Sequence, residues 1–253
     1  MDGMIKLPTN HSFDVFVEFP YTPGPSFAFL YFHFSEQQMQ LELQSIIPIP
    51  LKDRLLQRDS AVWNQALHFA QSEFIKIKAP SGTGKTTLVH IIYRLRNDFE
   101  GTVLWDGKHL KAIKPDELAA MRQKNISIIF QDLRLFQNLT ARENIELKRV
   151  LQKPFYEKNK IDEMADQLGI HSVLNQRAST CSYGEQQRIA IVRALMQPFD
   201  WIIMDEPFSH LDKKNIDKAS ALIETECRKR NAGFILTDLE DDNHFQYTKV
   251  LNL

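Results

Sequence analysis

The residues best suited to chemistry form a glycine-rich stretch at residues 79–87, which reads APSGTGKTT. It follows an apolar, β-prone run at residues 74–77, so the order is strand, turn and then helix. In such a turn the backbone N–H groups point inward and the helix adds the positive end of its dipole, which together favour a bound polyphosphate. Lys85 is placed to reach the outer phosphates, and the Thr86 hydroxyl is placed to ligate Mg²⁺.

The stretch departs from the pattern G-x-x-x-x-G-K-[ST] at one position, because its first residue is Ala79. Gly82 and Gly84 stand where the backbone must approach a ligand closely. The alternative is an ordinary glycine-rich turn with a solvated lysine. The helical spacing of Leu88, Ile91, Ile92 and Leu95 and the preceding strand favour the phosphate loop.

A pair of acids follows a second buried strand, predicted at residues 201–204. Asp205 is placed to hold the shell of a Mg²⁺ ion, and Glu206 to polarise an attacking water. The alternative is a strand end capped by acids before the turn at Pro207. A phosphate loop upstream favours the chemical interpretation.

Two further polar sites are ambiguous when each is taken alone. Gln131 follows the apolar run at residues 126–130 and is either a polar strand end or a group that reaches the metal and the water. Ser182 and Gly184 form a turn before a predicted helix, where a serine is usually an N-cap but also offers a hydroxyl and free N–H groups to an anion.

The elements that must position these residues alternate between strand and helix. We predict strands at 38–43, 67–77, 101–107, 126–130, 201–204 and 234–236, helices at 84–97, 115–123 and most of 132–196, and a loop at 48–60. This alternation indicates a largely parallel α/β sheet with a helical insertion before the strand at 201.

Composition narrows the class of protein. The 253 residues are 43% hydrophobic and 25% charged, which suits one large or two small globular domains. A formal net charge of −1 gives no basic footprint for nucleic acid, and Cys181 and Cys227 suggest neither a disulfide framework nor a metal site. We expect no signal peptide and no membrane-spanning helix.

In their order and spacing, the motifs resemble those of the nucleotide-binding subunit of ATP-binding cassette (ABC) transporters over about residues 38–253. They resemble the Walker A loop (79–87), the Q-loop (130–132), the ABC signature (181–188), Walker B (201–206) and the D-loop (209–212). The resemblance implies an α/β P-loop NTPase of the ABC-ATPase type, with a mixed sheet core, an antiparallel β subdomain and a helical subdomain at about 132–200. Residues 131–144 are similar to the lipoprotein-release, cell-division and macrolide-exporter group.

The resemblance also implies a function. Such subunits pair around two ATP molecules, hydrolyse them and drive or gate membrane permease subunits docked near residues 131–150. It implies a homodimer with ATP and Mg²⁺ as cofactors, no nucleic-acid partner, and a cytoplasmic location on the inner face of the cell membrane. With the spacing above, it assigns catalysis to Glu206, Gln131 and Lys85, ATP binding to Ser81, Gly82, Thr83, Gly84, Lys85, Thr86, Thr87, Ser182 and Gly184, and Mg²⁺ binding to Thr86, Gln131 and Asp205.

Several positions depart from the family. Tyr183 replaces a signature glycine and either clashes with a nucleotide or points away from it. Asp238 stands where the family has a switch histidine, and its negative charge is unfavourable near a polyanion unless it is protonated or turned away; His244 would need a different loop path to replace that histidine. The adenine-stacking aromatic is missing near Ile49 and Pro50, so an aromatic of the N-terminal segment, such as Tyr31 or Phe32, either covers the base or packs as core.

Two functional classes therefore stay open. The first is an ATPase motor, which the intact Glu206 favours and whose turnover we expect to be slow. The second is a nucleotide-gated binding module with little turnover, which Asp238 and Tyr183 favour. We treat residues 1–37, an aromatic-rich extension, as separate from the ATP-binding domain at 38–253.

Overall fold

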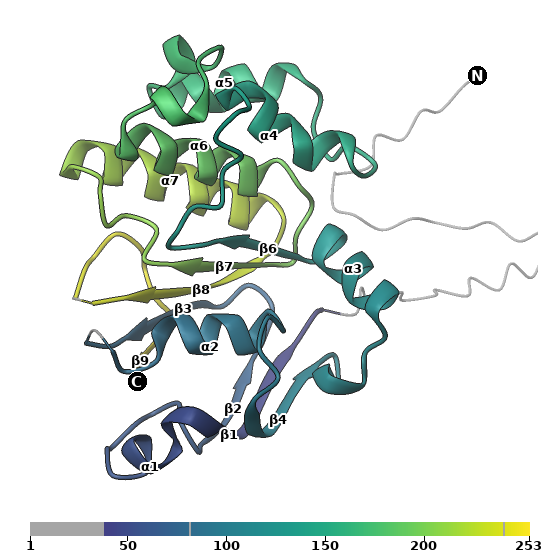
Figure 1. The fold of residues 1–253 in the computed structure, drawn as a ribbon, viewed down its shortest axis with the longest axis vertical. Helices are drawn as coiled ribbons and strands as arrows, with labels where there is room; N and C mark the ends of the chain where they lie inside the picture. The colour runs from purple at the N-terminus through teal and green to yellow at the C-terminus, as the bar shows by residue number, and fades with distance from the viewer. Residues whose placement is uncertain (1–37, 81, 240) are drawn as a thin grey trace, which may run out of the picture. The chain divides into compact units, whose positions relative to one another are not determined.

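The computed structural model describes residues 38–253, except for residues 81 and 240. The predicted extension at 1–37, including Tyr31 and Phe32, lies outside the described residues. The described chain forms two sheets with helices around them (Figure 1). No helix in this described part is long and apolar enough to cross a membrane.

A five-stranded sheet forms the centre of the fold, and each of its pairings is parallel. Its strand order is β6-β7-β8-β3-β9, with β3 (Phe74–Lys78), β6 (Ile126–Ile129), β7 (Trp201–Asp205), β8 (Gly233–Asp238) and β9 (Lys249–Asn252). Residues of β6, β7 and β8 are almost all buried, as expected for strands covered on both faces. The carboxyl ends of β3, β6, β7 and β8 therefore meet at one edge of the sheet.

Helices cover the two faces of this sheet. Helix α2 (Lys85–Ile92) packs on one face, where it shares a hydrophobic core with β1 (Leu41–Pro48) of the second sheet. Helices α6 (Tyr183–Leu195) and α7 (Lys213–Lys229) lie on the other face (Figure 1). Alternate residues of β7 separate the two cores, since Ile202 belongs to one and Ile203 to the other.

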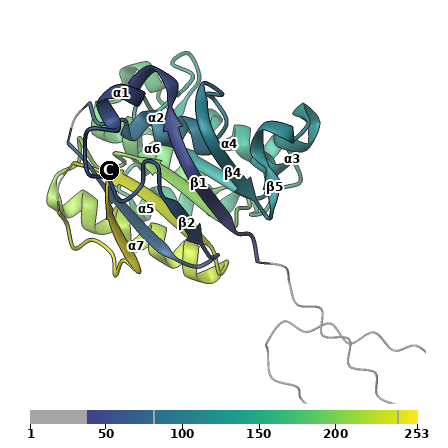
Figure 2. The same cartoon turned by 90° about the horizontal axis from the view of Figure 1, so that it is seen from below.

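The second sheet is antiparallel, so the mixed sheet architecture that we expected takes the form of two sheets of one kind each. Its order is β2-β1-β4-β5, with β1 (Leu41–Pro48), β2 (Ala66–Phe69), β4 (Phe99–Trp105) and β5 (Lys108–His109), and Figure 2 shows β1 beside β4. The register of β1 against β4 shifts between Gln44 and Ile47. Gly101 lies opposite this bulge with φ 81°, and a Cβ there would lie 2.3 Å from the Ser45 carbonyl oxygen, so only glycine fits.

The helical subdomain lies between β6 and β7 in sequence. It contains α4 (Ala141–Val150), α5 (Asn159–Gln167), two 3₁₀ turns (His171–Val173 and Ala178–Thr180) and α6. The prediction that most of 132–196 is helical is confirmed. Thr140 and Glu143 form a reciprocal capping box that begins α4.

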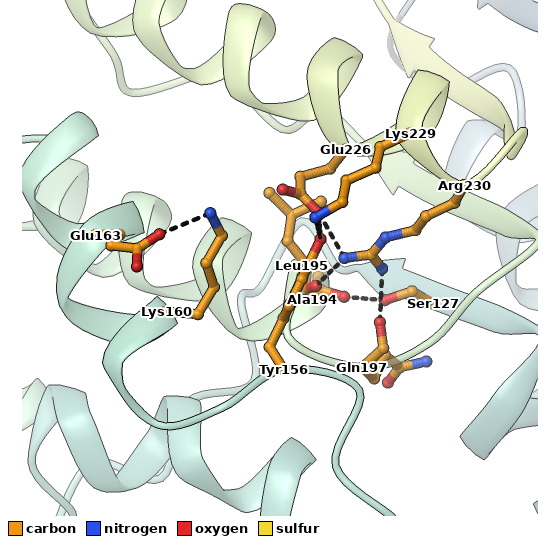
Figure 3. Close-up of polar contacts among 10 residues, drawn as sticks. All are labelled: Ser127, Tyr156, Lys160, Glu163, Ala194, Leu195, Gln197, Glu226, Lys229 and Arg230. Carbon is orange, nitrogen blue, oxygen red and sulfur yellow. Dashed lines mark hydrogen bonds and ion pairs between the residues drawn. The ribbon is translucent and has the colours of Figure 1, made fainter. Parts of the chain in front are cut away.

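A buried charge network joins this subdomain to α7 (Figure 3). The Arg230 guanidinium donates to Glu226 (2.6 Å) and to the carbonyl oxygens of Leu195 (2.8 Å) and Gln197 (2.7 Å). Leu195 is the last residue of α6, and Gln197 lies two residues beyond it. The Tyr156 hydroxyl donates to the same Glu226 carboxylate at 2.6 Å. The network therefore connects the chain before α5, the end of α6 and the end of α7.

Some predicted boundaries were wrong. Residues 48–60 are not only loop: a 3₁₀ turn (Ile49–Leu51) with Pro50 in its first turn leads into the short α1 (Lys52–Leu55). The first strand begins at Leu41 rather than at residue 38. Helix α2 ends at Ile92 rather than near 97, because the chain turns at Arg94 with φ 56°. Helix α3 (Pro115–Lys124) agrees closely with its prediction.

Candidate functional site

The strand ends bring the predicted site residues together at one edge of the parallel sheet. Lys85 is the first residue of α2, at the end of the loop after β3. Asp205 ends β7, Glu206 follows it, and Gln131 lies just beyond β6. Lys85, Thr86, Thr87, Gln131 and Glu206 line one cavity of about 370 Å³, together with Gly82, Gly84, Leu51 and Arg54. Ser81, one of the predicted phosphate contacts, lies outside the described residues.

Two glycines give the loop its shape. Gly82 has φ 76° and Gly84 has φ 104°, and α2 begins directly after Gly84. A Cβ on Gly84 would lie 3.1 Å from the Trp63 ring, whose Nε1 donates to the Thr83 carbonyl oxygen at 3.3 Å. The absent first glycine costs nothing here, because Ala79 is not among the described residues with positive φ.

Lys85 and Glu206 form a buried ion pair, with 3.0 Å between Nζ and Oε1. Lys85 also donates to the Ala79 carbonyl oxygen at 2.8 Å. Glu206 has φ 48°, a conformation that non-glycine residues adopt infrequently and that recurs at functional sites. The carboxylate is thus aimed back at the phosphate loop.

The Gln131 amide lies between two of the other predicted groups. Its Nε2 donates to Glu206 Oε2 at 3.2 Å, and its Oε1 accepts from the Thr86 hydroxyl at 3.2 Å. Taken alone, a glutamine after a strand is ambiguous, and only the family resemblance assigned Gln131 to catalysis and Mg²⁺ binding. In the structure its amide contacts both sides of the site.

Asp205 is 1% exposed, and Thr237 donates a 2.7 Å hydrogen bond to it. Burial raises the pKa of the Asp205 carboxyl, while the hydrogen bonds from Thr237 and Thr86 oppose that shift. Thr86, Gln131 and Asp205 thus bring a hydroxyl, an amide and a carboxylate oxygen close together. Mg²⁺ prefers such oxygen donors, completed by phosphate oxygens and water, so this donor set fits a Mg²⁺ ion.

Asp238, which stands where the family has a switch histidine, is partly buried. Burial raises the pKa of Asp238, against a hydrogen bond from the backbone N–H of Leu239 and the charge of Lys76. The nearby charges of Asp242 and Glu206 raise the pKa further. The His244 ring packs edge-on against Phe208, with 5.6 Å between ring centroids.

The signature turn begins α6 with a capping box between Ser182 and Glu185. A Cβ on Gly184 would lie 3.1 Å from the His210 carbonyl oxygen, so glycine permits this close approach. The Tyr183 side chain folds back onto its own chain: its hydroxyl lies 3.3 Å from the Gln131 carbonyl oxygen and its ring lies against His210. In this position the ring is turned toward residues of its own chain.

Three residues at the site were not predicted from the sequence. Leu51 and Arg54 line the cavity, and the Arg54 guanidinium donates to the Gly82 carbonyl oxygen. Gln187 connects the Glu206 carbonyl oxygen to the backbone N–H of His210. The signal for Gln187 was its place in the signature stretch, but a run of two glutamines does not tell which one points inward.

Comparison with known proteins identifies the family. The ABC transporter family model matches residues 63–209, more than half of the chain. The uncharacterized ABC transporter ATP-binding protein YvcR of Bacillus subtilis is 37% identical over 151 residues, which cover 59% of this chain and 58% of that protein. The lipoprotein-releasing system ATP-binding protein LolD 1 of Rhodopseudomonas palustris is 31% identical over 179 residues, 70% of this chain and 79% of that protein. The chain spans less than two thirds of the length of several curated relatives, YvcR among them.

Solved structures agree with this match. The dimeric ABC transporter cassette MJ0796 is 26% identical, with a TM-score of 0.68 over 81% of this chain and 89% of that one. A bacterial Atm1-family ABC exporter with ATP bound, 20% identical, has a TM-score of 0.70 over 85% of this chain and 37% of that one, which supports the fold alone. The chain therefore belongs to the ABC transporter family, and its described part has the P-loop fold of the family's ATP-binding cassette.

Proposed function

We propose that this chain is an ATP-binding and ATP-hydrolysing subunit that pairs with a second copy around two ATP molecules and drives a membrane-embedded partner. The observation that carries the proposal is the connected set around Glu206. Its carboxylate is paired with Lys85 and bonded to Gln131, which in turn contacts Thr86.

The phosphate loop binds the triphosphate. The N–H groups at the start of α2 and the Lys85 ammonium neutralise the β- and γ-phosphates. Thr86, Gln131 and Asp205 would hold the Mg²⁺ ion, which would neutralise charge that develops on the phosphate oxygens. These groups act by positioning and electrostatic stabilisation, the main contributions to phosphoryl transfer.

Glu206 orients the attacking water. Phosphate oxygens compete for the Lys85 ammonium, so nucleotide binding weakens the pair that now holds Glu206. The released carboxylate accepts a hydrogen bond from the water at Oε1, while Gln131 holds Oε2. ATP binding and water activation are thereby linked through one lysine.

The second copy completes the site. Ser182 and Gly184, at the positive end of α6, contact the γ-phosphate held by the other subunit. The dimeric cassette MJ0796, also solved bound to ADP and Pi, supports this arrangement. Relatives named for lipoprotein release and macrolide export support a permease partner. We place the subunit at the inner face of the cell membrane, docked through the region at 131–150.

A nucleotide-gated module with little turnover is the second candidate. Asp238 favours it, because a carboxylate beside Glu206 repels the polyanion.

Phosphate release by the wild-type chain and by Glu206→Gln distinguishes the two candidates. A motor shows slow, measurable release that Glu206→Gln reduces by about a hundredfold or more. Equal background release by both proteins, with ATP bound to each, would establish the gated module instead. Purification from membranes tests the partner: recovery with an integral membrane subunit supports the transporter role, and recovery alone from cytosol contradicts it.

A further inference from the structure

The segment from Gln131 to Arg134 has an unusual backbone. Leu133 has φ 56° and Arg134 has φ 47°, so two consecutive non-glycine residues adopt the left-handed region. Each such residue is strained, and strain persists only where surrounding contacts hold it. The contacts that hold this segment are therefore informative about its role.

One side chain of α6 holds the far end of the segment. Arg193 donates to the carbonyl oxygens of Leu133 (2.6 Å) and Arg134 (2.7 Å). Burial lowers the pKa of Arg193 only to about 10, so it is charged at neutral pH and makes strong, charge-assisted hydrogen bonds. The Arg134 guanidinium in turn stacks on the Phe130 ring, 3.8 Å from its centroid.

A second side chain of α6 holds the near end. The Tyr183 hydroxyl donates to the Gln131 carbonyl oxygen at 3.3 Å, and the tyrosine ring packs at 4.2 Å from His210, centroid to centroid. His210 is itself fixed, because its backbone N–H donates to Gln187 at 3.1 Å. Tyr183 thus connects the segment before the helical subdomain to the turn that follows Glu206.

The contact matters because of what the Gln131 side chain does. Its amide contacts Glu206 and Thr86, while its backbone carbonyl is the group that Tyr183 holds. With the far end fixed by Arg193, the hydrogen bond from Tyr183 limits how far the Gln131 backbone can swing away from the phosphate loop.

We propose that Tyr183 is a positioning residue, which holds the Gln131 backbone from within the same subunit so that the Gln131 amide stays at the Mg²⁺–phosphate side of the site. This inference rests on the proposed function. The proposal gives a role to the tyrosine that stands in place of a glycine. Its hydroxyl couples the signature turn to the segment from Gln131 to Arg134.

Binding of a non-hydrolysable ATP analogue tests the coupling without requiring turnover. Calorimetry with Mg²⁺ and, separately, with EDTA is run on the full chain, on Tyr183→Phe, on Gln131→Ala and on the double variant. We expect Tyr183→Phe to weaken binding about threefold to fivefold with Mg²⁺, as loss of one hydrogen bond predicts, and less than about twofold with EDTA. In the Gln131→Ala background, Tyr183→Phe should change binding by less than about twofold, because coupled residues are not additive.

The control is Tyr156→Phe, which removes a hydroxyl that donates a hydrogen bond to Glu226 in another part of the fold. It should lower stability in urea at least as much as Tyr183→Phe does and leave analogue binding unchanged. Equal affinity of wild type and Tyr183→Phe with Mg²⁺ would overturn the inference, and so would an equal loss in the Gln131→Ala background. Failure of the wild-type chain to bind the analogue would overturn the proposed function itself.

Discussion

The Lys85 ammonium lies 3.0 Å from the Glu206 carboxylate, and both side chains are buried in the wall of the site. A phosphate that binds to Lys85 must compete with this carboxylate. Replacing Glu206 by glutamine removes the competing charge but keeps a side-chain oxygen that can accept the hydrogen bond from Gln131. We expect Glu206→Gln to bind ATP about threefold to tenfold more tightly than wild type, measured by calorimetry.

Lys85→Ala is the control for that experiment, because it removes the phosphate-binding cation and leaves Glu206 buried without it. It should bind ATP too weakly to measure. An unchanged or weaker affinity for Glu206→Gln would mean that the pair does not restrain Lys85.

Alanine substitutions at the two glycines of the phosphate loop, Gly82 and Gly84, distinguish the cost of backbone strain from the cost of a steric clash. Both have positive φ, but a Cβ on Gly82 meets nothing within 4 Å, whereas one on Gly84 lies 3.1 Å from the Trp63 ring. Gly82→Ala should cost about 1–2 kcal/mol of unfolding free energy from strain alone. Gly84→Ala should cost a further 1–3 kcal/mol or so and shift the Trp63 fluorescence, because the ring must move.

Urea unfolding of the two alanine variants measures the difference, and Ala79→Gly serves as a control at a position with no need for positive φ. Equal losses for the two variants, with unchanged Trp63 emission, would rule out the clash.

Two arginine–glutamate pairs at the C-terminal end of α7 have the same sequence spacing but different burial, and Arg230 directly follows the helix. Arg230 and Glu226 are 4% and 3% exposed, while Arg228 and Glu224 are 59% and 31% exposed. Removing one partner of a buried pair leaves the other charge without compensation. Arg230→Met should therefore cost about 3–5 kcal/mol in urea unfolding, and Arg228→Met no more than about 1 kcal/mol. Similar losses for the two variants would show that burial does not set the cost.

The chemical residues were more predictable than the elements that support them. The phosphate loop and the acids after β7 are local patterns whose strand and turn signals lie within a few residues. The sequence patterns do not predict helix α7 or strand β9, and they predict a loop between residues 48 and 60, where the structure has a 3₁₀ turn and α1. These elements depend on partners distant in sequence, as β9 does on β3.

Lys76 shows what the sequence alone does not predict. In the sequence it is a charge within an apolar strand, and its burial is visible only in the fold, where it is 1% exposed and paired with Asp242. Tyr183 is similar, since the sequence placed it in the signature turn but could not give the direction of its ring. Contacts across tens or hundreds of residues decide both.

The pH dependence of stability tests the environment of Asp238. Burial raises its pKa in the folded chain above the unfolded value of about 4, so folding favours the protonated form. The contribution of this carboxyl to stability is therefore fully present below about pH 4 and is lost as the pH rises through the folded pKa. Asp238→Asn has no such loss. Its stability relative to wild type should increase from pH 4 to pH 7.5.

Urea unfolding at several pH values measures that difference, with Asp217→Asn as the control because Asp217 is an exposed carboxylate on α7.

The same Asp238→Asn protein should bind ATP more tightly at pH 7.5, since a negative charge beside Glu206 is removed. Asp238→His should go further and raise the rate of phosphate release, because a histidine can hold both the γ-phosphate and the water. If the stability of Asp238→Asn relative to wild type falls with pH, the wild-type carboxylate carries its charge in the folded chain without cost. If Asp238→His releases phosphate more slowly than wild type, the side chain at this position is turned away from the nucleotide.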